Sequence, residues 1–152
     1  VAHARFSKMG KERFIKKYHA IVHGNFENDE LTGLVDEPIG KIDSGVKRGV
    51  IPDGKSAQTE YKVLKQVSGA SLVELRLLTG RTHQIRVHMA YLGHPLYGDQ
   101  LYGIKDPFSR QALNCFYLSF PDPFNSEKNK TVEIPDPADM QKLWQGLINK
   151  KF

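Results

Sequence analysis

At 152 residues the chain is long enough for one domain with a sizeable hydrophobic core, and its 39% hydrophobic and 26% charged residues are ordinary for a globular protein. No apolar run approaches the ~20 residues of a membrane helix, so we expect no membrane partner. The net charge of +5 mildly favours a polyanionic partner. The single cysteine, Cys115, excludes an internal disulfide, and no signal peptide is visible, so we expect a cytoplasmic protein.

Residues 2–24 combine a predicted helix, a basic stretch and a predicted strand. The helix over 2–10 would end at Gly10. The arginines and lysines of 5–17 are either a solvated surface or one that contacts phosphates. Residues 14–24 alternate as a half-buried strand does, with Tyr18, Ala20 and Val22 on one face and His19, Ile21 and His23 on the other. Taken alone, Tyr18 would be a core tyrosine.

The middle of the chain is predicted to form hairpins. Residues 41–53 are a charged loop or a short hairpin, and Lys47, Arg48 and Lys55 form a second basic cluster there. Residues 58–67 and 70–78 alternate as two antiparallel strands, with Ser68-Gly69 as the turn between them.

A strand, a turn and a helix follow one another in residues 75–103. Thr79-Gly80 ends the strand, and Thr82 is the predicted N-cap of a helix that ends at Gly93. The free N–H groups of a helix start, together with Arg81 and Arg86, would bind a carboxylate or a phosphate. The alternative is a helix start with solvated arginines that binds nothing.

The C-terminal part predicts two strands, over 113–120 and 130–134, and a final helix. Asp136 is its predicted cap and Pro137 its first residue. An apolar stripe indicates core packing and comprises Met140, Leu143, Trp144, Leu147 and Ile148. We expect no metal site, because His83, His88 and His94 lack a zinc-type spacing, and the sequence has no Gly-rich phosphate loop.

Two motifs carry a resemblance to a known family. The run of about 25 residues TGRTHQIRVHMAYLGHPLYGDQLYG, from Thr79 to Gly103, resembles the C-terminal motif of the RluA-type RNA pseudouridine synthases. Residues 16–22 resemble the family's Lys-x-Tyr-x-Ala-x-Val motif. Two positions depart from the pattern, because Asn114 stands where a His is usual and Asp122-Pro123 where His-Pro is usual. The family's His-Arg-Leu-Asp segment, which carries the catalytic aspartate, has no match in residues 1–152.

The resemblance implies an α+β fold, with a mixed, mainly antiparallel sheet flanked by helices. It implies that residues 1–152 are the C-terminal part of a catalytic domain whose N-terminal part, with the nucleophilic aspartate, is absent. The first residue, Val1, also fits a chain cut from a longer one. Such a chain would lack turnover alone. It would expose apolar sheet surface that the missing half covers, and would therefore be prone to self-association.

The implied activity is the isomerisation of specific uridines in ribosomal or transfer RNA, through a covalent intermediate and with no cofactor. The resemblance makes Tyr18 the residue that stacks on the target base and removes its C5 proton. Arg86 would pair with the nucleophilic aspartate. Contacts with the RNA and the shaping of its pocket would fall to Lys16, Lys17, Arg81, Thr82, His83 and Gln84.

Two other functions fit the same residues. The chain could be an RNA-binding module without catalysis, using the same basic surface. It could also be a small-anion-binding domain at the helix start near Thr82, with little preference for RNA. An assay of uridine isomerisation in the longer parent protein separates catalysis from binding.

Overall fold

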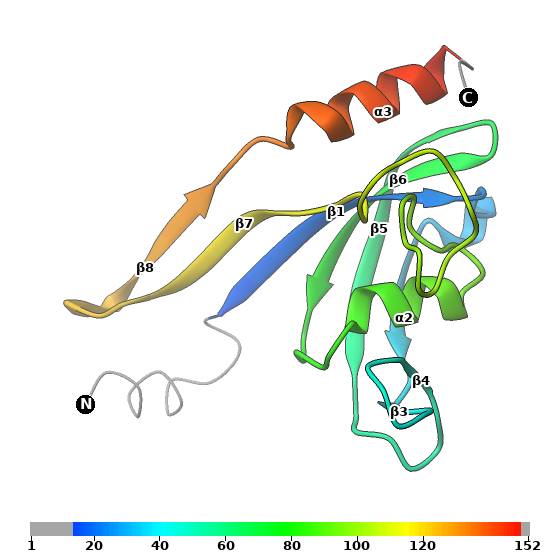
Figure 1. Ribbon diagram of the computed structural model, residues 1–152. Helices are drawn as coiled ribbons and strands as arrows, with labels where there is room; N and C mark the ends of the chain where they lie inside the picture. Colours follow the sequence, from blue (N-terminus) through cyan, green and yellow to red (C-terminus); the bar gives the residue numbers. More distant parts are fainter. Residues whose placement is uncertain (1–13, 150–152) are drawn as a thin grey trace.

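The alternating residues near the N-terminus form the central strand of an antiparallel sheet. The computed structural model describes residues 14–149, so the helix predicted over 2–10 lies outside the described residues. The strands are β1 (Ile15–His23), β2 (Thr32–Asp36), β3 (Ile39–Lys41), β4 (Arg48–Val50), β5 (Gln58–Val67), β6 (Ala70–Leu77), β7 (Leu113–Asp122) and β8 (Asn125–Glu133) (Figure 1). The helices are the short 3-10 helix η2 (Asn28–Glu30), α2 (Gln84–Tyr91) and α3 (Ala138–Ile148).

Six strands pair in the order β2-β5-β6-β1-β7-β8, and β3 pairs separately with β4. The predicted hairpin over 58–67 and 70–78 is confirmed as β5–β6. Of the charged segment 41–53, residues 41–50 lie in the β3–β4 hairpin, and residues 51–53 follow β4. The predicted fold class is confirmed. However, every strand pairing within residues 14–149 is antiparallel, so the expected mixture with parallel strands is not found there.

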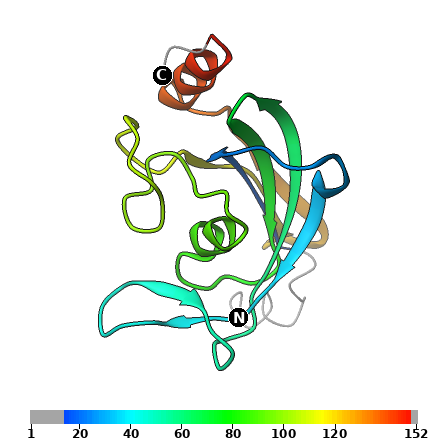
Figure 2. The same ribbon diagram turned by 90° about the vertical axis from the view of Figure 1, so that its right-hand side faces the viewer.

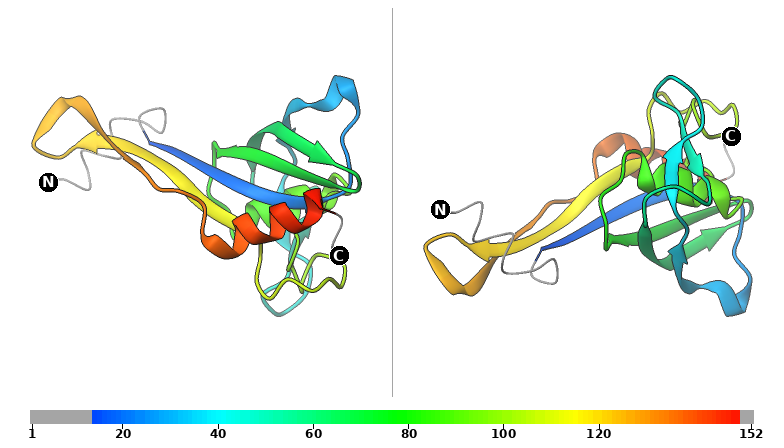
Figure 3. Two further views of the ribbon diagram at one scale, coloured as in Figure 1. Left: turned by 90° about the horizontal axis from the view of Figure 1, so that it is seen from above. Right: turned by 90° about the horizontal axis from the view of Figure 1, so that it is seen from below.

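The sheet is not evenly covered. The β7–β8 hairpin and the first half of β1 reach away from the rest of the molecule as a long arm (Figure 3). The rest of the six-stranded sheet curves around α2, which lies between this sheet and the β3–β4 hairpin (Figure 2). None of the helices in the described part of the chain is long and apolar enough to cross a membrane.

The two faces of β1 belong to two different hydrophobic clusters, as the alternation predicts. Ala20 and Val22 pack with Ile85 and Met89 of α2, and Tyr18 lies at the margin of this cluster. Ile21 packs on the opposite face, in a cluster that includes residues of α3. Of the predicted α3 stripe, Met140 and Leu143 are buried and Trp144 and Leu147 pack beside them, whereas Ile148 is exposed.

Asp136 is not the helix cap that the sequence predicts. Helix α3 begins at Ala138 and has Pro137 as its N-cap, without a side-chain cap. The Asp136 carboxylate instead accepts hydrogen bonds from His19 Nδ1 (2.9 Å) and Asn114 Nδ2 (2.9 Å). The Asp136 carboxylate therefore fixes the start of α3 against His19 of β1 and Asn114 of β7, and the Asn114 amide is one of its two donors.

Candidate active site

Helix α2 begins one residue later than predicted, and the prediction that Thr82 is its N-cap is wrong. The N-cap is His83, and Thr82 is an exposed turn residue. The side chain of Gln84 organises the turn instead. Its Oε1 accepts hydrogen bonds from Thr79 Oγ1 (2.8 Å) and the Arg81 amide (2.9 Å), and its Nε2 donates to the Gln58 carbonyl (2.9 Å) and to Thr59 Oγ1 (2.9 Å).

Gln84 is consequently buried, with 3% of its surface exposed. A direct contact between Gln84 and RNA does not fit this arrangement, because both ends of its amide are already paired inside the protein. Gln84 shapes the site by joining the start of α2 to β5. The end of α2 is as predicted, since Gly93 adopts φ +87° and its amide donates to the Ala90 carbonyl (3.0 Å).

His83 connects the helix start to the loop that follows the helix. It is the one non-glycine residue with positive φ (57°) in residues 14–149. Its Nδ1 lies 2.8 Å from the Tyr102 hydroxyl, which in turn accepts a hydrogen bond from the Arg48 amide (2.8 Å). Burial, followed by the nearby charges of Arg86 and Arg48, lowers the pKa of His83. The neutral imidazole therefore predominates at pH 7, and its Nδ1 can accept a hydrogen bond from the Tyr102 hydroxyl.

Arg86 is held by a carboxylate within this chain. Its Nε and Nη2 donate to the two oxygens of Asp99 at 3.0 and 2.8 Å, and its guanidinium lies 5.1 Å from the centre of the Tyr102 ring. The Asp99 side chain is 0% exposed and also accepts the amides of Leu101 (3.1 Å) and Tyr102 (3.0 Å). Two of the five guanidinium N–H groups are thus used, and the edge that carries Nη1 remains for another anion.

The protonation states of this pair follow from its surroundings. Burial raises the pKa of Asp99, but hydrogen bonds from Arg86 and the Tyr102 amide outweigh it and hold this pKa below its ordinary 3.8. The hydrogen bond to Asp99 raises the pKa of Arg86. Both groups are therefore charged at neutral pH. Asp99 is not among the site residues predicted from the sequence, although a half-buried arginine on a helix requires a nearby anion.

The loop that carries Asp99 is anchored to β1. The amide of Gly98 donates to the Asp106 carboxylate (3.0 Å), which also pairs with His23 Nε2 (2.8 Å). Gly98 adopts φ +75°, and a Cβ there would lie 1.7 Å from the Arg110 carbonyl oxygen, so only glycine fits. The position of Asp99, and through it of Arg86, is set by these contacts.

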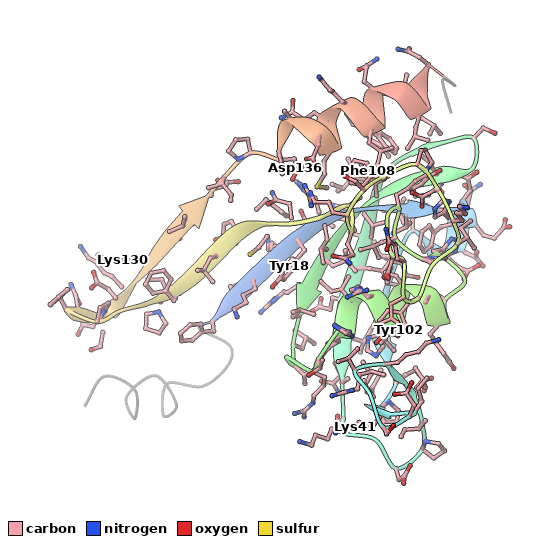
Figure 4. All side chains as sticks on the ribbon, in the orientation of Figure 1. Tyr18, Lys41, Tyr102, Phe108, Lys130 and Asp136 are labelled. Carbon is pink, nitrogen blue, oxygen red and sulfur yellow. The ribbon has the colours of Figure 1, made fainter. Side chains whose placement is uncertain are left out.

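Tyr18 lies on the same side of the sheet as Arg86. It is half-buried on β1 beside the cluster that contains Ile85 of α2, and its partner in the β1–β7 register is Cys115 (Figure 4). Burial raises the pKa of the Tyr18 phenol above its ordinary 10.0, and Cys115 raises it further. The phenol form consequently predominates at neutral pH.

The two lysines before Tyr18 point to opposite faces of the sheet. Lys16 is exposed and shares the face of Tyr18 by strand alternation. Lys17 lies on the other face, 5.0 Å from the Tyr117 ring, and lines a groove of about 620 Å³ with Glu60 and Arg76. The structure therefore does not bring Lys17 to the candidate site, contrary to the sequence-based grouping of the two lysines.

Arg81 and Thr82 border a separate cavity at the start of α2, described below. Within residues 14–149, no group of three or more His, Cys, Asp or Glu side chains is arranged to hold a metal ion. The candidate site therefore combines a fixed guanidinium, a half-buried phenol on the same side of the sheet, and the exposed Lys16 on the face of that phenol. These groups suit a substrate that combines an aromatic ring with negative charge.

Comparison with known proteins decides the family. The sequence pattern of the family described as RNA pseudouridylate synthase matches residues 1–91. The chain belongs to this family. Its match includes β1, with Tyr18, and α2, with Arg86.

Relatives and solved structures agree with this assignment. The chain is 46% identical over 148 residues to the uncharacterized RNA pseudouridine synthase YjbO of Bacillus subtilis, covering 95% of this chain and 51% of YjbO. It is 38% identical to ribosomal large subunit pseudouridine synthase D of Nitrosomonas europaea, covering 91% of this chain and 43% of that protein. The structure of human RNA pseudouridylate synthase domain containing 1 superimposes with a TM-score of 0.74 at 30% identity, over 90% of this chain and 59% of the human chain. The chain thus spans about half the length of these relatives.

The Arg86–Asp99 pair makes a prediction about stability. We expect Asp99→Asn to lower the free energy of unfolding by about 3–5 kcal/mol, because it breaks a buried charge pair and leaves Arg86 uncompensated. The matched control is Asp139→Asn, which removes the same bidentate contact from the exposed Arg110–Asp139 pair and should cost about 0–1 kcal/mol. Urea unfolding of the variants measures both values.

The pH dependence of the free energy of unfolding tests the Arg86–Asp99 pair a second time. Since the pKa of folded Asp99 is below 3.8, its stabilising contribution is complete above that value and is lost as the pH falls through the lower, folded pKa. The Asp99→Asn variant should lack this acid-dependent loss. Equal effects of the two Asp→Asn changes would show that burial of the Arg86–Asp99 pair has no energetic weight.

Proposed function

We propose that the protein isomerises specific uridines of ribosomal or transfer RNA to pseudouridine. The observation that carries this proposal is the Arg86 guanidinium, held by Asp99 on the same side of the sheet as Tyr18, in a chain of the pseudouridine synthase family. The chain would form the C-terminal part of the catalytic domain. The remaining part, with the nucleophilic aspartate, would precede it in the complete protein.

In this proposal Arg86 positions the nucleophile. The Nε edge of its guanidinium is occupied by Asp99, and the edge with Nη1 would bind the carboxylate of the upstream aspartate. A carboxylate bound to a fixed cation stays ionised and keeps one orientation, which a nucleophile requires. Asp99 would act through Arg86 as a positioning residue.

Tyr18 would act on the base. During isomerisation the bond from N1 of uracil to C1′ of the ribose breaks, the base turns, and C5 forms the new bond to C1′. The proton on C5 must then leave, while N1 gains one, so that product and substrate have the same composition. The half-buried ring of Tyr18 would stack on the extruded base, and its phenolate would accept the C5 proton. As the family resemblance implies, we infer no cofactor for this isomerisation.

The function is tested by an isomerisation assay on the product of the complete reading frame that contains this sequence. The substrate is RNA from cells that lack the gene, so that the target uridines are unmodified. We expect pseudouridine to form, and we expect Arg86→Lys to lower kcat by about 100-fold or more, because an ammonium cannot bridge two carboxylates as a guanidinium does. RNA affinity should change by less than about threefold.

The control for this variant is Arg110→Lys, which alters an exposed arginine that also forms a bidentate pair. It should retain wild-type kcat. Full activity of Arg86→Lys would contradict the proposed role of Arg86. Binding of RNA without any pseudouridine formation by the complete protein would favour the non-catalytic RNA-binding module.

Tyr18 gives a separate prediction about pH. Because its pKa is raised above 10.0, the phenolate fraction is small at neutral pH and grows about tenfold per pH unit. If the phenolate takes the proton, kcat should rise with this slope between about pH 7 and pH 9, wherever proton removal limits the rate. Tyr18→Phe should bind RNA with nearly wild-type affinity, since its ring still stacks, but lose about 100-fold or more in kcat.

The control here is Tyr117→Phe, which removes a hydroxyl from β7 beside Lys17 on the other face. Its kcat and pH profile should match those of the wild type. A flat wild-type profile together with a fully active Tyr18→Phe variant would restrict Tyr18 to stacking.

A further inference from the structure

A second cavity opens at the start of α2, between the β3–β4 hairpin and the turn that follows β6. Its volume is about 480 Å³. Its lining includes Ile39, Gly40, Lys41, Arg48, Asp53, Gly54, Lys55, Gly80, Arg81 and Thr82. In Figure 4, Lys41 lies in this β3–β4 lobe, below Tyr102. Residues from four separate segments of the chain therefore meet around one opening.

The cavity is strongly basic. Four cations line it, namely Lys41, Arg48, Lys55 and Arg81, against the single carboxylate of Asp53. In the described part of the chain, the ion pairs within 4.0 Å involve none of these four cations. Positive charge gathered without internal compensation favours an external anion.

Neutral backbone carbonyls hold the two arginines in place without neutralising them. Arg48 Nη1 donates to the carbonyl oxygens of Val46 (2.8 Å) and Gly45 (3.3 Å). Arg81 Nε donates to the Ser56 carbonyl (2.7 Å). Both guanidinium groups consequently keep their full charge and further N–H donors for a ligand.

Two glycines of the cavity lining, Gly54 and Gly80, differ in the space around them. A Cβ at Gly54 would lie 2.6 Å from the Ile39 carbonyl carbon, so the backbone passes too close there for any side chain. A Cβ at Gly80 would have no heavy atom within 4 Å, so the wall beside Arg81 is open. The Arg48 amide also binds the Tyr102 hydroxyl, which connects the cavity to the Arg86 site.

We propose that this basic cavity binds backbone phosphates of the RNA next to the nucleotide at the Tyr18–Arg86 site. The proposal rests on the proposed function, since it takes RNA as the ligand. One free phosphate would leave most of the four cations unpaired, whereas successive phosphodiesters of one strand can each meet a cation. The lining residues Arg81 and Thr82 directly precede α2, and Tyr102 contacts both Arg48 and Arg86, so a bound strand would continue from one site to the other.

The test measures RNA affinity as a function of salt for the product of the complete reading frame. The probe is a fluorescein-labelled single-stranded oligouridylate, followed by anisotropy between about 50 and 200 mM salt. We expect the double variant Lys41→Ala/Lys55→Ala to bind about tenfold more weakly at the low-salt end. The slope of log K against log salt should fall by about 1.4, because each phosphate contact with a single strand contributes about 0.7.

The matched control is Lys65→Ala/Lys142→Ala, which removes the same charge from exposed lysines of β5 and α3. It should leave the slope unchanged. Equal losses in both double variants, or no change of slope in Lys41→Ala/Lys55→Ala, would overturn the proposal.

A second experiment titrates the protein with inorganic phosphate at constant ionic strength. Saturable phosphate binding that is lost in Lys41→Ala/Lys55→Ala, without any change in the RNA salt slope, would assign the cavity to free phosphate. That result would also overturn the proposal.

The isomerisation assay separates this proposal from the proposed function. If the complete protein forms pseudouridine and the cavity variant raises KM without lowering kcat, both proposals are supported. A complete protein that forms no pseudouridine, but whose RNA slope falls in the cavity variant, would refute the function and keep the phosphate site. Wild-type KM and salt slope in the cavity variant of an active enzyme would refute the phosphate site alone.

Discussion

A single charge pair, Arg86 with Asp99, organises the candidate site. The fully buried carboxylate occupies one edge of the guanidinium and is itself held by the amides of Leu101 and Tyr102. A flexible arginine thereby becomes a cation of fixed direction, with its other edge available to a second anion. The loop after α2 holds Asp99 in place, because the Asp106 carboxylate binds the Gly98 amide and His23 of β1. In physical terms, the fold fixes the direction of one cation in the candidate site.

The two faces of the sheet carry two different hydrophobic clusters. On one face Tyr18 and the helix α2, which carries Arg86, lie against the apolar cluster of Val73, Leu75 and Met89. On the other face α3 covers Ile21, and Asp136 fixes it through His19. Because neighbouring residues of a strand point to opposite faces, the nine residues of β1 contribute to both clusters.

Local patterns in the sequence predict much of the fold but little of the site's internal bonding. The alternation of β1, the β5–β6 turn at Gly69 and the end of α2 at Gly93 depend on neighbouring residues, so the sequence reveals them. The caps predicted at Thr82 and Asp136 are wrong because tertiary partners compete: Gln84 organises the turn before α2, and Asp136 binds His19 and Asn114. The pairing of Arg86 with Asp99 depends on a loop conformation that no periodicity encodes. The separation of Lys16 from Lys17, by contrast, follows from strand alternation alone.

The most direct test of this account is a crystal structure of the product of the complete reading frame. The account predicts that Arg86 keeps its Nε and Nη2 bonds to Asp99 while Nη1 lies about 3 Å from the carboxylate of an aspartate that precedes Val1 in the chain. That carboxylate should face the same side of the sheet as Tyr18. A structure in which Arg86 has left Asp99, or in which the outer edge of its guanidinium meets no carboxylate, would contradict the central claim.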